Sequence, residues 1–151
     1  CIMRGYLNDD AQTDRAMSGS WFFTGDTGYI DDRGRLVLVG RTRSEINKGG
    51  IKVAPESIDA VMERHPAISE ACAFGVDDAI LGQNVAIAVV LDLSVGAPPN
   101  AVELMRWCSS QLSDYMTPAI WYRLSDLPRT STGKVDRLEI ARLSGPLERM
   151  R

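Results

Sequence analysis

Three apolar segments alternate with polar stretches in the second half of the chain. Residues 68–76 and 85–91 are rich in Ala, Val and Ile and are bounded by Asp, Gly and Pro, and residues 120–124 form a third apolar run. Short apolar runs between turn-forming residues are typical of buried strands. The pattern therefore predicts a central sheet of about three strands.

Helical spacing appears between and after these strands. A helix is predicted to begin at Pro55, which suits a first helical position, and its apolar face would hold Ile58, Val61 and Met62. Asn100 and Glu103 have the spacing of a capping box for a second helix. The inner face of that helix is expected to contain Ala101, Leu104, Met105, Cys108 and Leu112. A closing helix is predicted over residues 137–143, so the fold class is α+β.

The first forty residues follow a different pattern. A short surface helix is predicted within residues 9–17, and residues 28–30 and 35–39 flank a polar turn, which indicates a β-hairpin. The apolar pattern stops at residues 40–43, the predicted boundary. We therefore expect three parts: a β-rich remnant of a larger domain at 1–42, a small domain at 43–143, and a tail at 144–151.

Composition excludes several classes of protein. With 44% hydrophobic residues, 25% charged residues and a net charge of -3, the chain is neither disordered nor a basic nucleic-acid binder. Its apolar runs are too short to span a membrane and no signal peptide opens it, so a cytoplasmic location is predicted. Three widely spaced cysteines and one histidine predict reduced thiols and no metal site. The start at Cys1, without Met, indicates a piece of a longer protein.

Three short motifs place small and charged residues together. Asp26, after Thr24 and Gly25, is either a turn residue or a ligand for ribose hydroxyls, because a carboxylate offers two acceptor oxygens. Arg41 and Lys52, which lie on either side of Gly49 and Gly50, belong either to a solvated basic hairpin or to a phosphate site.

The third motif, Thr130-Ser131-Thr132-Gly133-Lys134, is either a surface loop or a loop that presents a catalytic lysine. It is not a Walker A loop. Pro128 stands where that loop has its first glycine, and Val135 stands where it has Ser or Thr.

Taken in order, these motifs resemble one family. They are Gly5-Tyr6-Leu7, Trp21-Phe22 with Thr24-Gly25-Asp26, Tyr29-Ile30-Asp31 with Gly34, Gly40-Arg41, Gly49-Gly50 with Pro55, and Gly133-Lys134. The chain resembles the C-terminal part of the adenylate-forming superfamily of acyl-CoA synthetases, carrier-linked adenylation domains and luciferases. The resemblance covers roughly residues 2–143.

The resemblance implies a two-step reaction. A carboxylic acid attacks ATP to give acyl-AMP and pyrophosphate, and CoA then displaces AMP to give a thioester. By resemblance Lys134 is the catalytic residue, Asp26 binds the ribose, and Arg41 and Lys52 contact the nucleotide. The resemblance also places Gly49 and Gly50 in the tunnel for the CoA thiol.

The remaining parts of such an enzyme are expected outside this sequence. A large N-terminal domain would be this chain's partner and would carry the Mg²⁺ ligand and the acid pocket, so the present chain alone is expected to be inactive. Arg43 occupies the hinge position about which the small domain would swing between the two steps. Two alternatives remain open: an adenylation domain that transfers to a carrier-protein thiol, and a non-catalytic interaction module that retains the fold.

Overall fold

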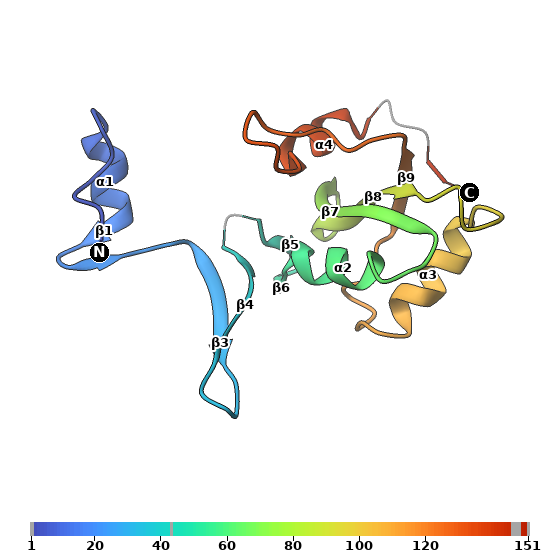
Figure 1. Ribbon diagram of the computed structural model, residues 1–151, viewed down its shortest axis with the longest axis horizontal. Coiled ribbons are helices and arrows are strands. Elements are labelled where there is room, and N and C mark those ends of the chain that lie inside the picture. Colours follow the sequence, from blue (N-terminus) through green and yellow to red (C-terminus); the bar gives the residue numbers. More distant parts are fainter. Residues whose placement is uncertain (1, 43, 146–148, 151) are drawn as a thin grey trace. The chain divides into compact units, whose positions relative to one another are not determined.

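The computed structural model describes residues 2–42, 44–145 and 149–150 and contains two compact units, residues 1–43 and 44–151 (Figure 1). Arg43, the predicted hinge, lies outside the described residues. In the first unit, α1 (Asp10–Ala16) is followed by two antiparallel pairs of strands. These are β1 (Met17–Ser18) with β2 (Trp21–Phe22), and β3 (Asp26–Ile30) with β4 (Leu36–Arg41). The predicted surface helix and hairpin are therefore confirmed.

The second unit is an α+β domain built on one sheet. Its elements are β5 (Ile46–Lys48), β6 (Ile51–Val53), α2 (Pro55–Met62), β7 (Ile68–Asp78), β8 (Gly82–Leu91), α3 (Ala101–Ser109), β9 (Ile120–Leu124) and α4 (Arg137–Leu143). β8 pairs antiparallel with β7 and parallel with β9. The short β5–β6 hairpin joins the start of β8 through the pair Lys48 and Gly82, giving five strands in all. The predicted α+β fold class is confirmed, but the sheet has five strands where about three were expected, because the short β5–β6 hairpin also joins it.

Helices cover both faces of this sheet (Figure 1). Alternate residues of a strand point to opposite faces. In β8, Val85, Ile87 and Val89 pack in one core with α2 and α3, whereas Ala86 and Ala88 pack in a second core with Ile140 of α4. This burial on both faces explains why the strands read as continuous apolar runs.

Helix α3 begins as predicted. The Asn100 side chain accepts from the Glu103 N–H, and the Glu103 carboxylate accepts from the Asn100 N–H. Ala101, Leu104 and Cys108 are buried, but Met105 is 39% exposed, so its expected place on the inner face is wrong. Met105 lies one helical step beyond Leu104, at the edge of the apolar stripe.

Two of the three cysteines fit the prediction of reduced, buried thiols. Cys72 and Cys108 are buried and form no disulfide. Burial raises the pKa of the Cys72 thiol to about 12 and that of Cys108 to about 11, so both stay protonated at neutral pH. Cys1 lies outside the described residues. No helix in the described part of the chain is long and apolar enough to cross a membrane.

Candidate functional site

Lys134 lies on a tight turn between β9 and α4. Arg129 and Val135 form an isolated antiparallel bridge, and the Thr130 N–H donates to the Lys134 carbonyl at 2.8 Å. The Gly133 N–H closes the turn on the Thr130 carbonyl at 2.9 Å. Gly133 has a φ of 83°, which glycine adopts without a Cβ penalty. The residues before the lysine therefore build a small hairpin that presents it.

The Lys134 side chain points into solvent. The residue is exposed, and within the described residues its ammonium makes no hydrogen bond or ion pair. An ammonium held by an ordered backbone but not engaged by the protein is available to an incoming anion. The turn therefore offers one mobile point charge to a carboxylate or a phosphate.

An arginine on the turn ties it to the sheet. Arg129 donates through Nη1 to the Gly133 carbonyl at 3.2 Å, and through Nη2 it forms an ion pair with Glu70 on β7. Gly133 directly precedes Lys134. The guanidinium thus connects the backbone beside the lysine to a strand of the domain core.

A second arginine, Arg137, anchors the other side of the turn. It is the first residue of α4, and its side chain is 23% exposed. Its Nη2 lies 2.9 Å from Asp59 Oδ2 and 3.6 Å from Glu56 Oε1, both on α2. Its Nη1 donates to the Ala73 carbonyl on β7 and lies 3.4 Å from Cys72 Sγ. One guanidinium therefore joins α4, α2 and β7.

Asp59 completes this arrangement from α2. Its Oδ1 accepts the Ala73 N–H at 2.5 Å. Burial raises the pKa of Asp59 to about 6, and the positive charge of Arg137 opposes part of that rise. The Asp59 carboxylate is ionised at neutral pH, but its pKa of about 6 lies close to that pH.

The free energy of unfolding is expected to fall as the pH rises from about 4 to about 6. The folded-state pKa of Asp59, about 6, lies above its ordinary value of 3.8. The native state therefore holds a proton that the unfolded chain releases. That stability is fully present below the unfolded pKa and is lost as the pH rises through the folded one. Urea unfolding at several pH values, with native protein and Asp59→Asn, measures the contribution of Asp59 protonation to the free energy of unfolding.

In this experiment Asp59→Asn should have a flatter profile in that window. Asp92→Asn serves as a matched control, because hydrogen bonds from Ser94 lower the pKa of Asp92, whereas burial raises that of Asp59. Equal slopes in native protein and Asp59→Asn would contradict the assignment.

The β5–β6 hairpin brings a glycine backbone to the surface. Gly49 and Gly50 have φ values of 60° and 89°, and Asn47 Oδ1 accepts from the Gly50 N–H at 3.1 Å. The Gly49 N–H donates to the Leu81 carbonyl in the β7–β8 turn at 2.8 Å. Lys52 is exposed on β6, opposite Asn47. The hairpin is held firmly while its tip remains free of side chains.

In the first unit the structure joins two of the predicted nucleotide residues. Asp26 and Arg41 are partners across β3 and β4, and Arg41 Nε lies 2.8 Å from Asp26 Oδ1. Thr24 Oγ1 accepts from the Asp26 N–H at 3.1 Å. The Asp26 carboxylate is therefore oriented by a neighbouring cation and by its own turn.

The predicted residues fall on separate elements. Asp26 and Arg41 belong to the first unit, whereas Gly49, Gly50 with Lys52, and Lys134 belong to the second. No hydrogen bond or ion pair between described residues links the lysine turn to the β5–β6 hairpin. The second unit thus carries two separate features, a lysine turn and a glycine hairpin.

The sequence analysis missed Arg129, Arg137, Asp59 and Glu70. One signal was present, because a cation at the first position of a helix opposes the helix dipole and so indicates a specific acidic partner. The identity of that partner was not visible, since Asp59 lies 78 residues before Arg137.

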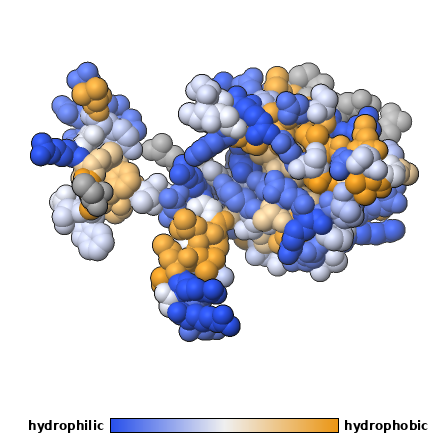
Figure 2. Space-filling view, viewed as in Figure 1, coloured by the Kyte–Doolittle hydropathy of each residue, from blue (hydrophilic) through white to orange (hydrophobic). Residues whose placement is uncertain are grey.

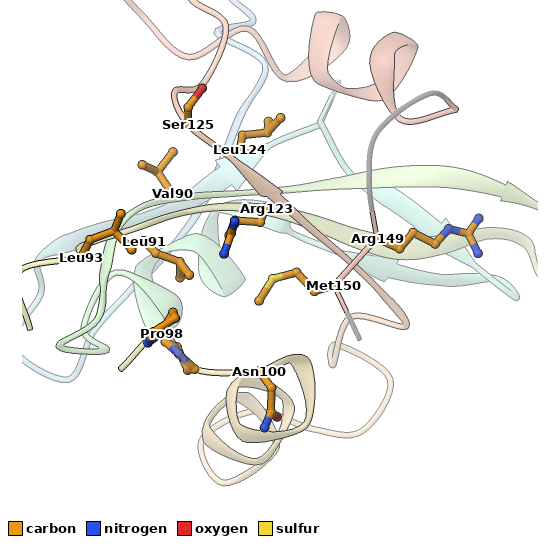
Figure 3. Close-up of a pocket in the computed structure, with 11 residues that line it drawn as sticks. Val90, Leu91, Leu93, Pro98, Asn100, Arg123, Leu124, Ser125, Arg149 and Met150 are labelled. Atoms are coloured by element: carbon orange, nitrogen blue, oxygen red, sulfur yellow. The ribbon is translucent and has the colours of Figure 1, made fainter. Parts of the chain in front are cut away.

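An open pocket of about 730 Å³ lies at the C-terminal ends of β8 and β9. Leu91, Arg123 and Met150 project toward its centre (Figure 3). None of the predicted site residues lines it. Within the described residues, no group of three or more His, Cys, Asp or Glu is arranged to hold a metal ion.

The lysine turn and the sheet before it match a known domain. A model of the family described as "AMP-binding enzyme C-terminal domain" matches residues 57–134, just over half of the chain. The chain belongs to this family. The match ends at Lys134 and includes most of α2 and all of β7, β8, α3 and β9. The resemblance recognised in the sequence is thereby confirmed.

Relatives and solved structures agree with this assignment. The chain is 36% identical over 140 residues to the probable CoA ligase CCL9 of Humulus lupulus, covering 93% of this chain and 26% of the relative. It matches o-succinylbenzoate CoA synthetase from Bacillus subtilis, in complex with an acyl-adenylate, with a TM-score of 0.84 and 31% identity over 92% of this chain and 28% of that one.

A third match is to an enzyme that makes a different product. Amide bond synthetase McbA from Marinactinospora thermotolerans matches with a TM-score of 0.86 and 30% identity, over 94% of this chain and 28% of that chain. The chain thus spans between a quarter and a third of the length of these proteins.

Proposed function

We propose that this chain is the C-terminal part of an ATP-dependent acid–thiol ligase that activates a carboxylic acid as acyl-AMP and transfers it to CoA. Family membership carries the proposal, and the names of CoA-ligase relatives support it. The acid is a fatty or other organic acid, and a cytoplasmic location remains a prediction.

In the first step a carboxylate oxygen attacks the α-phosphorus of ATP. The new phosphorus–oxygen bond forms as the bond to pyrophosphate breaks, and pyrophosphate leaves with the electron pair. The attacking acid is already ionised at neutral pH, so the step needs positive charge rather than a general base. Lys134, exposed on its turn, supplies that charge to both anions. Magnesium, which accompanies ATP, is assigned to the proposed large domain.

The nucleotide is proposed to contact three further residues. Arg41 donates through Nε to Asp26 Oδ1 and so fixes the carboxylate, whose Oδ2 would accept from the ribose hydroxyls. The Arg41 guanidinium has terminal N–H groups with which it would contact phosphate. Lys52, exposed on β6, would add a second cation.

In the second step the CoA sulfur attacks the acyl carbonyl of acyl-AMP. A carbon–sulfur bond forms, the carbon–oxygen bond to AMP breaks, and the thiol proton passes to solvent. The Gly49–Gly50 backbone is proposed to line the path of the pantetheine arm, because the side-chain-free tip allows close approach. Arg43 keeps its proposed role as the hinge between the two steps.

Gly50→Ala is expected to slow thioester formation about tenfold in the full-length protein. A Cβ at Gly50 meets no atom within 4 Å, but its φ of 89° strains any other residue and would shift the tip. Formation of acyl-AMP should change little. Single-turnover rates of CoA acylation, with Gly34→Ala as a matched positive-φ control, test this role. Equal slowing of both steps would contradict it.

The first unit supports the proposal of a larger partner domain. None of its described residues is fully buried. The β3–β4 hairpin exposes the large apolar side chains of Ile30, Leu36 and Leu38 on one of its faces, and Figure 2 shows an orange patch over this hairpin. A contiguous exposed apolar face marks a contact surface. We assign this face to the proposed large N-terminal domain and expect the present chain alone to be inactive.

A second candidate concerns the acceptor. The match to an amide bond synthetase makes an amine the alternative to the CoA thiol, and a carrier-protein thiol is a third acceptor to test. A non-catalytic module is disfavoured because folding does not require Lys134, Asp26 and Arg41 together.

The test is acid-dependent exchange of labelled pyrophosphate into ATP by the full-length product of the gene that encodes this chain. We expect exchange with at least one acid of a panel of short, long and aromatic carboxylates. CoA, carrier-bound pantetheine and amines are then supplied to the acyl-AMP formed. Absence of exchange across the panel would overturn the proposal.

A further inference from the structure

The lysine turn is held on both sides by arginines bound to the same strand. Arg129 reaches Glu70 on β7, and Arg137 reaches the Ala73 carbonyl on β7. Lys134 lies between them, five residues after the first and three before the second. Backbone hydrogen bonds shape the turn itself, and the two guanidinium contacts attach it to β7.

The Arg137 contact depends on the position of β7 in the sheet. This strand lies at the edge of the sheet, so its outward backbone groups have no neighbouring strand. At Ala73, Asp59 accepts the outward N–H and Arg137 donates to the outward carbonyl. An ion pair at 2.9 Å joins these two side chains. Together they bond the two backbone groups of Ala73 that a neighbouring strand would otherwise pair with.

This arrangement couples the start of α4 to the core. The arginine engages two carboxylates and a carbonyl from two elements, which requires a planar fork of donors rather than a single ammonium. A lysine at this position keeps the charge but cannot hold all of these acceptors in one geometry. The start of α4, and with it the turn, would lose its fixed position.

We propose that Arg137 is a positioning residue for Lys134. This proposal rests on the proposed function, in which Lys134 acts in adenylation only. Arg137 touches no substrate. It fixes the backbone from which the lysine reaches the acid and the α-phosphate, with Asp59 as its partner and Arg129 with Glu70 as a second anchor.

The test compares both half-reactions in full-length native protein and Arg137→Lys. We expect the kcat for acid-dependent pyrophosphate exchange to fall about 10- to 100-fold, since misplacement of a reacting group by about 1 Å has effects of that size. The KM values for ATP and acid should stay unchanged, as should the rate of thioester formation from supplied acyl-AMP. Glu70→Gln, which weakens the other anchor, should lower exchange several-fold.

Arg142→Lys is the matched control. Arg142 lies on the same helix, its side chain is 80% exposed, and among the described residues it forms an ion pair with Glu139 alone. It should match native protein in both steps. Equal loss of both steps in Arg137→Lys would mean that the arginine serves the fold alone, and no loss in either step would mean that it does not position the lysine. Absence of exchange in the native protein would instead overturn the proposed function.

Discussion

Lys134→Ala in the full-length protein should lower acid-dependent pyrophosphate exchange by about 10²- to 10³-fold. Removing one preorganised group that stabilises transition-state charge has effects of this size. The lysine side chain is exposed and makes no hydrogen bond or ion pair within the described part of the domain, so its removal should leave the fold intact. Steady-state exchange at saturating ATP and acid measures the effect.

The control for this experiment is another cation in the same domain. Arg142→Ala removes an exposed positive charge from α4 and should exchange at the native rate. Lys134→Arg should recover part of the activity, because it restores the charge with a different shape. If Lys134→Ala exchanged pyrophosphate at the native rate, the lysine would have no role in acid activation.

Arg137→Ala should lower the free energy of unfolding of the 151-residue chain by about 3 kcal/mol. Removing one partner of a buried ion pair leaves the other charge without compensation. The estimate lies at the low end for buried pairs, because the side chains of Arg137 and Asp59 are 23% and 15% exposed. Urea unfolding at pH 7, followed by circular dichroism, measures the loss.

Two further measurements identify the cause of that loss. The double variant Arg137→Ala with Asp59→Ala should be more stable than Arg137→Ala alone, because the isolated carboxylate is gone. The loss should also shrink at about pH 4, where Asp59, with its pKa of about 6, is protonated. A loss that is independent of both pH and Asp59 would assign the effect to packing of the arginine stem.

Local patterns predicted the elements of the fold well. The capping box at Asn100 and the glycine turn at Gly49 are encoded within a few residues, and the predicted helix 137–143 has the bounds of α4. Strand ends were less visible. β7 and β8 continue through polar residues into their shared turn, because backbone pairing does not require apolar side chains.

Long-range features could not be read from local patterns. The parallel pairing of β9 with β8 joins segments separated by a helix, and the bond from Arg137 to Asp59 spans 78 residues. Lys134 was found because its motif is contiguous. Its anchors were missed because each depends on the place of β7 at the sheet edge.

The central claim is that Lys134 serves the first half-reaction and not the second. The most direct test is the ratio of two rates measured on one preparation of full-length Lys134→Ala: pyrophosphate exchange, and thioester formation from supplied acyl-AMP and CoA. We expect exchange to be reduced by about 10²-fold or more and thioester formation to stay near the native rate. Equal reduction of both rates, or native rates in both, would contradict it.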